Sequence, residues 1–154
     1  MNLTNLNVPT IEELRIKPHV DPLNLRFPDV VCPMKPLGNR VLVQIRMPIT
    51  RTAGGLLLTS DNIEDQYRNE QTAKVIRIGE SAFFFTTGEA WPYGPTFAEG
   101  DYVRVPLHGG DNHWITATIN GHEEKVCFKT FKDYEIISLI EGDPLAVRTN
   151  YAYY

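Results

Sequence analysis

A series of short apolar runs, separated by glycine, proline and asparagine, constrains the fold of this chain more than any other feature. The runs cover residues 40–45, 73–79, 102–105, 114–119, 124–128 and 135–141. Residues 114–119 alternate in polarity, as strands with one buried face do. The dipeptide Asn120-Gly121, between two runs, is typical of a two-residue β-hairpin turn. Short strands with this punctuation predict an all-β domain, either a small barrel or a sandwich.

The composition is that of an ordinary globular domain and argues against several classes of protein. The chain has 154 residues, of which 42% are hydrophobic and 22% are charged, and these values suit one domain with arms. A net charge of -4 gives no reason to expect nucleic acid as a partner. No apolar run approaches the length of a membrane span, and the first residues lack the pattern of a signal peptide. We therefore expect a cytoplasmic protein.

The segment Thr52-Ala-Gly-Gly-Leu-Leu-Leu-Thr59 is the strongest candidate for a binding site. Loops normally run over the surface, and exposed apolar groups there usually mark a contact with another molecule. The candidate contact residues are Gly54, Gly55, Leu56, Leu57, Leu58 and Thr59. In the alternative, residues 56–58 form a buried strand beside residues 75–78. The three leucines lack the alternation of a half-buried strand and follow two glycines, which favours the binding loop.

Both ends of the chain read as arms. Residues 1–33 contain prolines at positions 9, 18, 22, 28 and 33. Because proline fixes a backbone dihedral and removes a donor, we expect at most a turn or two of helix, at residues 10–15, where Thr10 and Glu13 match a capping box. The apolar residues of this arm favour a contact with a neighbouring subunit over a disordered tail. The C-terminal tail, residues 143–154, ends in tyrosines that suit either an interface or a solvated tail.

Groups that could carry out catalysis or bind a metal are sparse. His108 and His113 lie near Asp111 in the sequence and could approach a zinc ion, but a polar loop between strands is the favoured interpretation. Cys32 and Cys127 have no evident activating neighbour, and we expect reduced thiols rather than a disulfide. The chain has no phosphate-binding or dinucleotide-binding loop and no serine nucleophile motif. We therefore expect no enzyme activity, no cofactor and no metal.

Segments along residues 34–142 resemble, in order, the sequences of GroES-type co-chaperonins. Met34-Lys-Pro-Leu-Gly-Asn-Arg-Val-Leu-Val resembles the opening strand of that family. Ala53-Gly-Gly-Leu-Leu-Leu-Thr59 resembles the mobile loop that binds the large chaperonin ring, and Ala73-Lys-Val-Ile-Arg-Ile-Gly79 resembles the next strand. Gly100-Asp-Tyr-Val-Arg-Val and Glu135-Ile-Ile-Ser-Leu-Ile-Glu141 resemble two later strands. The resemblance implies an irregular small β-barrel over residues 34–142, with extended N- and C-terminal arms, a mobile loop at residues 50–71, and a ring of identical subunits.

The two arms and a long aromatic loop distinguish this chain from ordinary members of that family. The aromatic residues of the loop are Phe83, Phe84, Phe85, Trp91, Tyr93 and Phe97. In the family this region is the hairpin that forms the roof of the dome, and here it also suits packing on a large partner. Stacking on nucleic-acid bases is disfavoured because basic residues do not cluster beside the rings. These additions would suit a virus-encoded relative.

Two functions follow as hypotheses. The resemblance favours a cytoplasmic co-chaperonin that caps a large chaperonin ring through the mobile loop and assists protein folding. The alternative is a virion structural protein, a capsid decoration or cement subunit, which reuses the same barrel and clamps neighbouring capsid proteins with residues 1–33 and 143–154. In both cases we expect a homo-oligomer and no partnership with nucleic acid or membrane.

Overall fold

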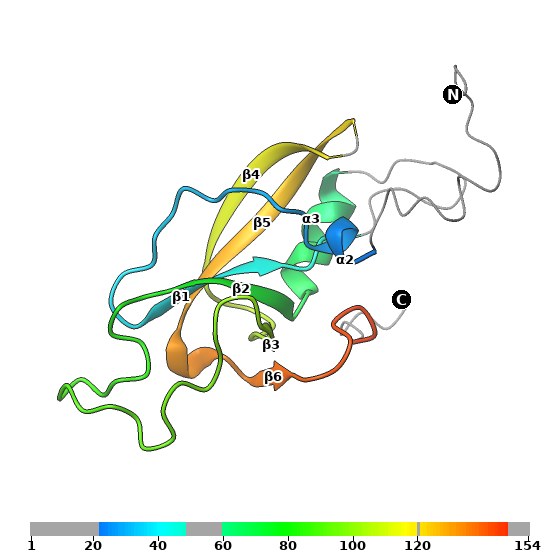
Figure 1. Cartoon of the computed structure of the whole chain (residues 1–154). Helices are drawn as coiled ribbons and strands as arrows, with labels where there is room; N and C mark the ends of the chain where they lie inside the picture. Colours follow the sequence, from blue (N-terminus) through cyan, green and yellow to red (C-terminus); the bar gives the residue numbers. More distant parts are fainter. Residues whose placement is uncertain (1–21, 49–59, 120, 148–154) are drawn as a thin grey trace, which may run out of the picture.

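The strands form one antiparallel sheet. The computed structural model describes residues 22–48, 60–119 and 121–147. Its elements are α2 (Pro22–Arg26), β1 (Arg40–Ile45), α3 (Ser60–Asn69), β2 (Thr72–Ile78), β3 (Tyr102–Arg104), β4 (Asp111–Ile119), β5 (His122–Lys132), the 3-10 helix η1 (Asp133–Glu135) and β6 (Ser138–Ile140). The strand order is β4-β5-β1-β2-β3-β6 (Figure 1). In the described residues no pairing joins β4 to β6, so the sheet is curved but its ladder is not closed.

The expectation of an all-β fold is confirmed, and each predicted apolar run overlaps a strand. The run at residues 40–45 coincides with β1, and the other strands differ from their runs by a few residues at the ends. Strands β4 and β5 form the predicted hairpin, in which Ile119 is opposite His122. Gly121 has a φ of 81°, a left-handed backbone conformation that favours glycine in such a turn.

Strand β1 lies at the centre of the sheet and is buried on both faces. Val41, Val43 and Ile45 belong to the larger apolar cluster, which also contains residues of β2, β3 and β5. Leu42 belongs to a second cluster with Cys32, Val126 and Phe128 on the other face. Double-sided burial explains why the run shows no clear alternation of apolar and polar residues.

Part of the predicted N-terminal arm packs on the chain's own sheet. Phe27 and Cys32 are each 3% exposed, and the Gln44 side-chain amide donates a hydrogen bond of 2.8 Å to the carbonyl of Pro28. Residues 22–33 therefore contact the sheet of the chain itself, and the predicted contact of the arm with a neighbouring subunit stays a prediction. Residues 1–21, including the predicted short helix at residues 10–15, lie outside the described residues.

Helix α3 is an element that the sequence pattern did not predict. The polar residues 60–71 suggested a continuation of the loop, but residues 60–69 are helical. Ile63 and Tyr67 lie one helical turn apart, and both pack on the larger apolar cluster. Two apolar side chains give too narrow a stripe to stand out in a polar sequence.

No helix among the described residues is both long enough and apolar enough to cross a membrane.

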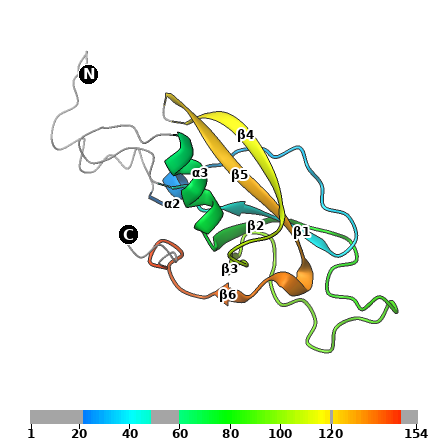
Figure 2. The same ribbon diagram turned by 180° about the vertical axis from the view of Figure 1, so that it is seen from behind.

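The two views of the ribbon show a clear division of the molecule. Helices α2 and α3 and the last described residues, up to residue 147, lie at one end (Figures 1 and 2). The loop that contains the aromatic residues extends from the opposite end. The start of α3, which follows the predicted binding loop in the chain, therefore lies at the same end as α2 and the described part of the C-terminal tail.

Candidate partner-binding site

The predicted contact residues occupy the connection between β1 and α3. Gly54, Gly55, Leu56, Leu57, Leu58 and Thr59 lie outside the described residues, as does the alternative in which residues 56–58 form a strand. We call residues 50–59 the predicted binding segment. The structure describes the residues on either side of it, which end at Pro48 and resume at Ser60. The geometry of these flanks is therefore what the structure contributes to the site.

The flank before the predicted binding segment is held by the N-terminal arm. The backbone N–H of Met47 donates a hydrogen bond to the carbonyl of Arg26, with N and O 2.7 Å apart, at the short end of the usual range. In return the Arg26 side chain donates through Nε to the carbonyl of Met47. Met47 is 4% exposed. Both backbone polar groups of this residue are thus paired with one residue of α2.

The flank after the segment is held by packing of α3 on the β4–β5 hairpin. The Tyr67 ring is fully buried and meets the Trp114 ring edge to face, with centroids 5.4 Å apart. Its hydroxyl donates to the carbonyl of Lys125, with the two oxygens 2.5 Å apart. Burial raises the pKa of the Tyr67 hydroxyl, so this group keeps its proton and remains a donor.

An exposed ion pair lies beside this contact. The Lys125 ammonium is 2.7 Å from the Glu64 carboxylate and 5.8 Å from the centroid of the Trp114 ring. The hydrogen bond and charge of Lys125 lower the pKa of Glu64. Because solvent screens the pair, its contribution to stability is small compared with the burial of Tyr67.

A buried ion pair joins the two flanks. The Arg46 guanidinium faces the Glu70 carboxylate in a two-point contact, Nε to Oε1 at 3.0 Å and Nη2 to Oε2 at 3.1 Å. The side chains are only 3% and 4% exposed. Glu70 Oε2 also accepts the backbone N–H groups of Gln71 and Thr72, each at 3.1 Å. Such pairing satisfies a buried carboxylate that would otherwise be costly.

The C-terminal tail completes this arrangement. Arg46 Nη1 donates to the carbonyl of Pro144 at 2.8 Å and to that of Val147 at 2.6 Å. We call the Arg46 guanidinium, the Glu70 carboxylate and these two carbonyls the Arg46 clamp. The described parts of both terminal arms therefore meet the chain at Arg46 and Met47, shortly before the predicted binding segment.

The aromatic loop is a folded lobe. Within this lobe, residues 80–100, the Phe83 ring contacts the rings of Trp91 and Phe97 edge to face, with centroids 5.5 Å and 5.0 Å apart. Phe83 has a φ of 69°, unusual for a residue with a side chain. Its N–H donates to the buried Asp133 carboxylate at 2.8 Å, which holds this conformation in place. The other Asp133 oxygen accepts the N–H of Tyr134 at 2.8 Å.

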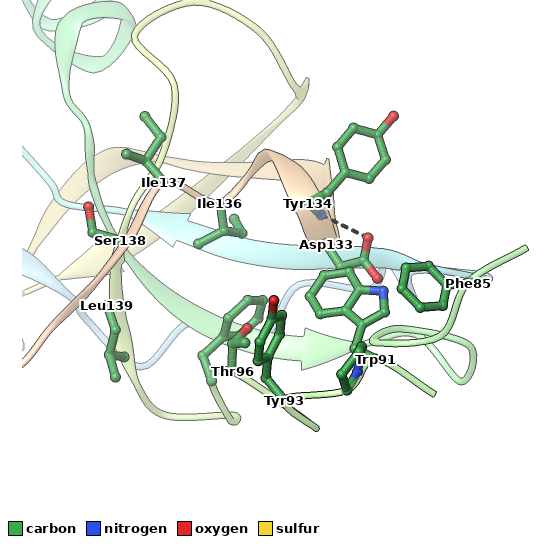
Figure 3. Close-up of a pocket in the computed structure, with 12 residues that line it drawn as sticks. Phe85, Trp91, Tyr93, Thr96, Asp133, Tyr134, Ile136, Ile137, Ser138 and Leu139 are labelled. Atoms are coloured by element: carbon green, nitrogen blue, oxygen red, sulfur yellow. Dashed lines mark hydrogen bonds between the residues drawn. The ribbon is translucent and has the colours of Figure 1, made fainter. Parts of the chain in front are cut away.

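A groove of about 510 Å³ separates the aromatic lobe from the segment that leads into β6. Figure 3 shows Phe85, Trp91 and Tyr93 from the lobe around it, together with residues 136–139, which lead into β6 and form its start. Tyr93 is 85% exposed, and among the described residues that line the groove the only charged one is Asp133, which is already hydrogen-bonded. The groove is thus a largely apolar surface whose one charged side chain is already hydrogen-bonded.

The groups considered for metal binding do not assemble into a site. His113 lies on β4 with Nε2 3.5 Å from the Asp111 carboxylate, while His108 is exposed in the preceding loop. Within residues 22–48, 60–119 and 121–147, no group of three or more histidine, cysteine or acidic side chains is arranged to hold a metal ion.

Both cysteines are free and buried. Cys32 and Cys127 belong to different apolar clusters, on opposite faces of the sheet. Burial raises the pKa of the Cys127 thiol to about 12, although the charge of nearby Lys129 acts in the opposite direction. A thiol in this environment is unreactive near neutral pH.

The sequence analysis missed the anchoring residues Arg46, Glu70 and Tyr67. A weak signal for α3 was present, since Ser60, Asp61 and Asn62 are residue types found at helix starts and Ile63 and Tyr67 have helical spacing. No local signal connected Arg46 with Glu70, which is 24 positions away, or with Pro144, which is 98 positions away.

Comparisons with known proteins agree with the fold. The family described as "Chaperonin 10 Kd subunit" matches residues 33–133. The co-chaperonin GroES of Lactococcus lactis subsp. cremoris (strain SK11) is 31% identical over 108 residues, which cover 70% of this chain and 99% of the relative. The mitochondrial 10 kDa heat shock protein of Saccharomyces cerevisiae is 32% identical over 108 residues, covering 70% and 89%. The corresponding protein of Schizosaccharomyces pombe is 29% identical over 106 residues, covering 69% and 88%.

Proposed function

This chain belongs to the family of chaperonin 10 kDa subunits, and on that premise we propose that it caps a large chaperonin ring and assists protein folding. The observation that carries the proposal is the position of the Gly-Gly-Leu-Leu-Leu motif. The motif lies inside the part of the chain that matches the family, between β1 and α3. Gly54, Gly55, Leu56, Leu57, Leu58 and Thr59 are the proposed contact residues.

The expected energetics suit a cap that binds and releases. Burying one leucine contributes roughly 1.5–3 kcal/mol, so the three leucines offer about 5–9 kcal/mol. Ordering each residue of the segment costs about 1–2 kcal/mol, which cancels most of that gain. A single segment should therefore bind weakly. In a ring of identical subunits each later contact forms at high effective concentration, and the ring binds as a unit.

The flanks support this function. Arg26, Arg46, Tyr67 and Glu70 hold the chain at both ends of the predicted binding segment. Anchored ends reduce the conformational freedom that binding must remove. Gly54 and Gly55 allow the backbone to adopt conformations that other residues disfavour.

The proposal includes a homo-oligomer in the cytoplasm with the large chaperonin as its partner. The relatives reported above carry the names of co-chaperonins and of mitochondrial heat shock proteins, and the family is not one of enzymes. None of those relatives is named as a virion protein. In the described part of the chain, residues of both arms hydrogen-bond to the chain's own residues Gln44 and Arg46. The family match therefore favours the co-chaperonin over the capsid alternative.

A pull-down and ATPase assay with a bacterial large chaperonin and ATP tests the proposal. The wild-type ring should bind in a nucleotide-dependent way and change the ATPase rate. Leu57→Glu should abolish binding while leaving the ring intact, because it places a charge in an apolar contact. Thr116→Glu is the matched control, since it adds the same charge at an exposed position of β4. Equal binding of Leu57→Glu and wild type would contradict the proposed contact.

A further inference from the structure

The C-terminal tail makes an unusual contact for a chain end. Its described residues, 143–147, contribute two backbone carbonyls to a buried arginine, with donor–acceptor distances of 2.8 Å and 2.6 Å. Pro144 is itself buried. This region follows the part of the chain that matches the family, which ends at residue 133. The contact is therefore an addition of this chain to the matched domain.

The arginine that receives the tail lies close to the start of the predicted binding segment. The Arg46 backbone N–H donates to the carbonyl of Thr72 at 2.9 Å, and its side chain pairs with Glu70. Four guanidinium contacts thus hold this side chain, two from Glu70 on the flank after the segment and two from the tail. A planar guanidinium held in this way has little freedom to change its position.

From this geometry we infer that residues 143–147 are a strap that positions the predicted binding segment through Arg46. The strap keeps the β1 end of the segment in a fixed relation to α3. Without it, Arg46 Nη1 loses both carbonyl acceptors, and the buried guanidinium must draw in water or move. The backbone after Arg46 then has more conformational freedom. Binding of the large chaperonin must therefore order more of the chain. This inference deepens the proposed function and rests on it for its effect on the partner.

Two truncated chains separate the strap from the rest of the tail. A chain that ends at Gly142 lacks both carbonyls, whereas a chain that ends at Arg148 retains them and is the matched control. The first readout is the rate of trypsin cleavage after Arg51, followed by mass spectrometry well below the melting temperature. We expect the chain ending at Gly142 to be cleaved about tenfold faster than the control. We also expect weaker binding of the large chaperonin by the shorter chain.

A second readout is amide hydrogen exchange at Arg46, the residue that the strap contacts, and at its neighbour Met47. The amide hydrogens of Arg46 and Met47 are paired with Thr72 and Arg26. Their exchange with deuterium should be faster in the chain ending at Gly142 than in the chain ending at Arg148. Phe97→Leu in the full chain controls for general destabilisation, because it weakens the opposite end of the molecule. It should leave cleavage after Arg51 unchanged.

A milder variant serves if the shorter chain does not fold. The Asp143 carboxylate accepts the N–H of Leu145 at 2.9 Å and shapes the turn that presents the tail carbonyls. Asp143→Ala should raise the cleavage rate about threefold, compared with no change for Asp29→Ala at another exposed aspartate.

Equal cleavage and exchange rates within each matched pair would overturn the inference that residues 143–147 act as a strap. The cleavage and exchange measurements need no chaperonin, so they test the strap even if the wild-type ring fails to bind one. That failure would count against the proposed function alone. Binding by wild type together with equal rates in the matched pairs would count against the strap alone.

Discussion

The Arg46 clamp and the aromatic lobe stabilise opposite ends of the molecule by different physical means. The clamp consists of directional hydrogen bonds around a buried charge pair. The lobe consists of ring contacts around Phe83, in which the burial of area matters more than the direction of any one bond. Directional bonds define a position closely but tolerate few substitutions, whereas apolar packing tolerates changes that conserve volume.

Both ends depend on the chain that follows β5. Asp133 anchors the lobe through the N–H of Phe83, and the carbonyls of Pro144 and Val147 complete the clamp. A single C-terminal segment therefore connects the two regions. Substitutions that affect one end and spare the other can test whether the regions are independent.

Arg46→Met should have the largest effect on stability. The substitution leaves the Glu70 carboxylate buried without its counter-charge, and it removes the partner of two carbonyls. Breaking one side of a buried ion pair costs about 3–5 kcal/mol in the free energy of unfolding, which chemical denaturation would measure. Arg40→Met, at the exposed start of the same strand, is the control and should change stability by less than about 0.5 kcal/mol. A similarly small change for both variants would show that the Arg46 clamp contributes little to the free energy of unfolding.

Asp133→Asn should have the next largest effect, and at the other end. An asparagine can accept through only one of its two terminal atoms, so either Phe83 or Tyr134 loses its acceptor. A buried N–H without a partner costs about 1–3 kcal/mol. The loss should appear as faster amide exchange in the lobe, with no change at Arg46. Asp29→Asn, at an exposed site, should be neutral, and faster exchange at Arg46 in Asp133→Asn would show that the two ends are coupled.

Tyr67→Phe should have a smaller effect, because the ring stays in place. The variant removes only the hydroxyl that donates to the carbonyl of Lys125. A hydrogen bond of this kind contributes about 0.5–1.5 kcal/mol to the free energy of unfolding. Tyr134→Phe, at a residue that is 64% exposed, provides the comparison and should be close to neutral. Equal changes in melting temperature for the two variants would indicate that the hydrogen bond of the Tyr67 hydroxyl does not stabilise the fold.

Lys129→Met should have the smallest effect, and its size depends on pH. Lys129 is 3% exposed, and burial lowers the pKa of its amine from the ordinary value of 10.5. The unfolded chain then holds the proton more tightly, so the wild type gains stability as pH rises from the lowered pKa to 10.5. Methionine removes this dependence of stability on pH. Lys129→Met should therefore have a larger free energy of unfolding than the wild type at neutral pH, and this difference should shrink as the pH approaches 10.5. A gain that stays constant up to high pH would contradict the assignment.

The opposite pH dependence of Cys127 does not obscure this comparison. Its raised pKa lowers stability as the pH rises above its ordinary value of 9.0. Both wild type and Lys129→Met retain Cys127, but methionine removes the lysine charge that lowers the pKa of this thiol. Below pH 9.0 the thiol keeps its proton in both the folded and the unfolded chain, so unfolding curves compared below that pH isolate the lysine.

The strands and the family could be predicted from the sequence because their signals are local. The run at residues 40–45, the Asn120-Gly121 turn and the motif at residues 53–59 can each be read within a short window. Burial on both faces of β1 and the helix at residues 60–69 were harder to predict, because they depend on which apolar surfaces meet in the folded chain. The contact residues at positions 54–59 remain a prediction from the sequence.

The amino-acid sequence alone was enough to identify an all-β member of the co-chaperonin family with a glycine–leucine segment between its first two strands. How the flanks of that segment are held became visible only in the folded chain. Arg46 meets Glu70 and the carbonyl of Pro144 across separations of 24 and 98 residues. Such pairings leave no periodic pattern in the chain, because a side chain in water has no preference for a distant partner. The preference arises when burial removes water and makes an unpaired charge costly.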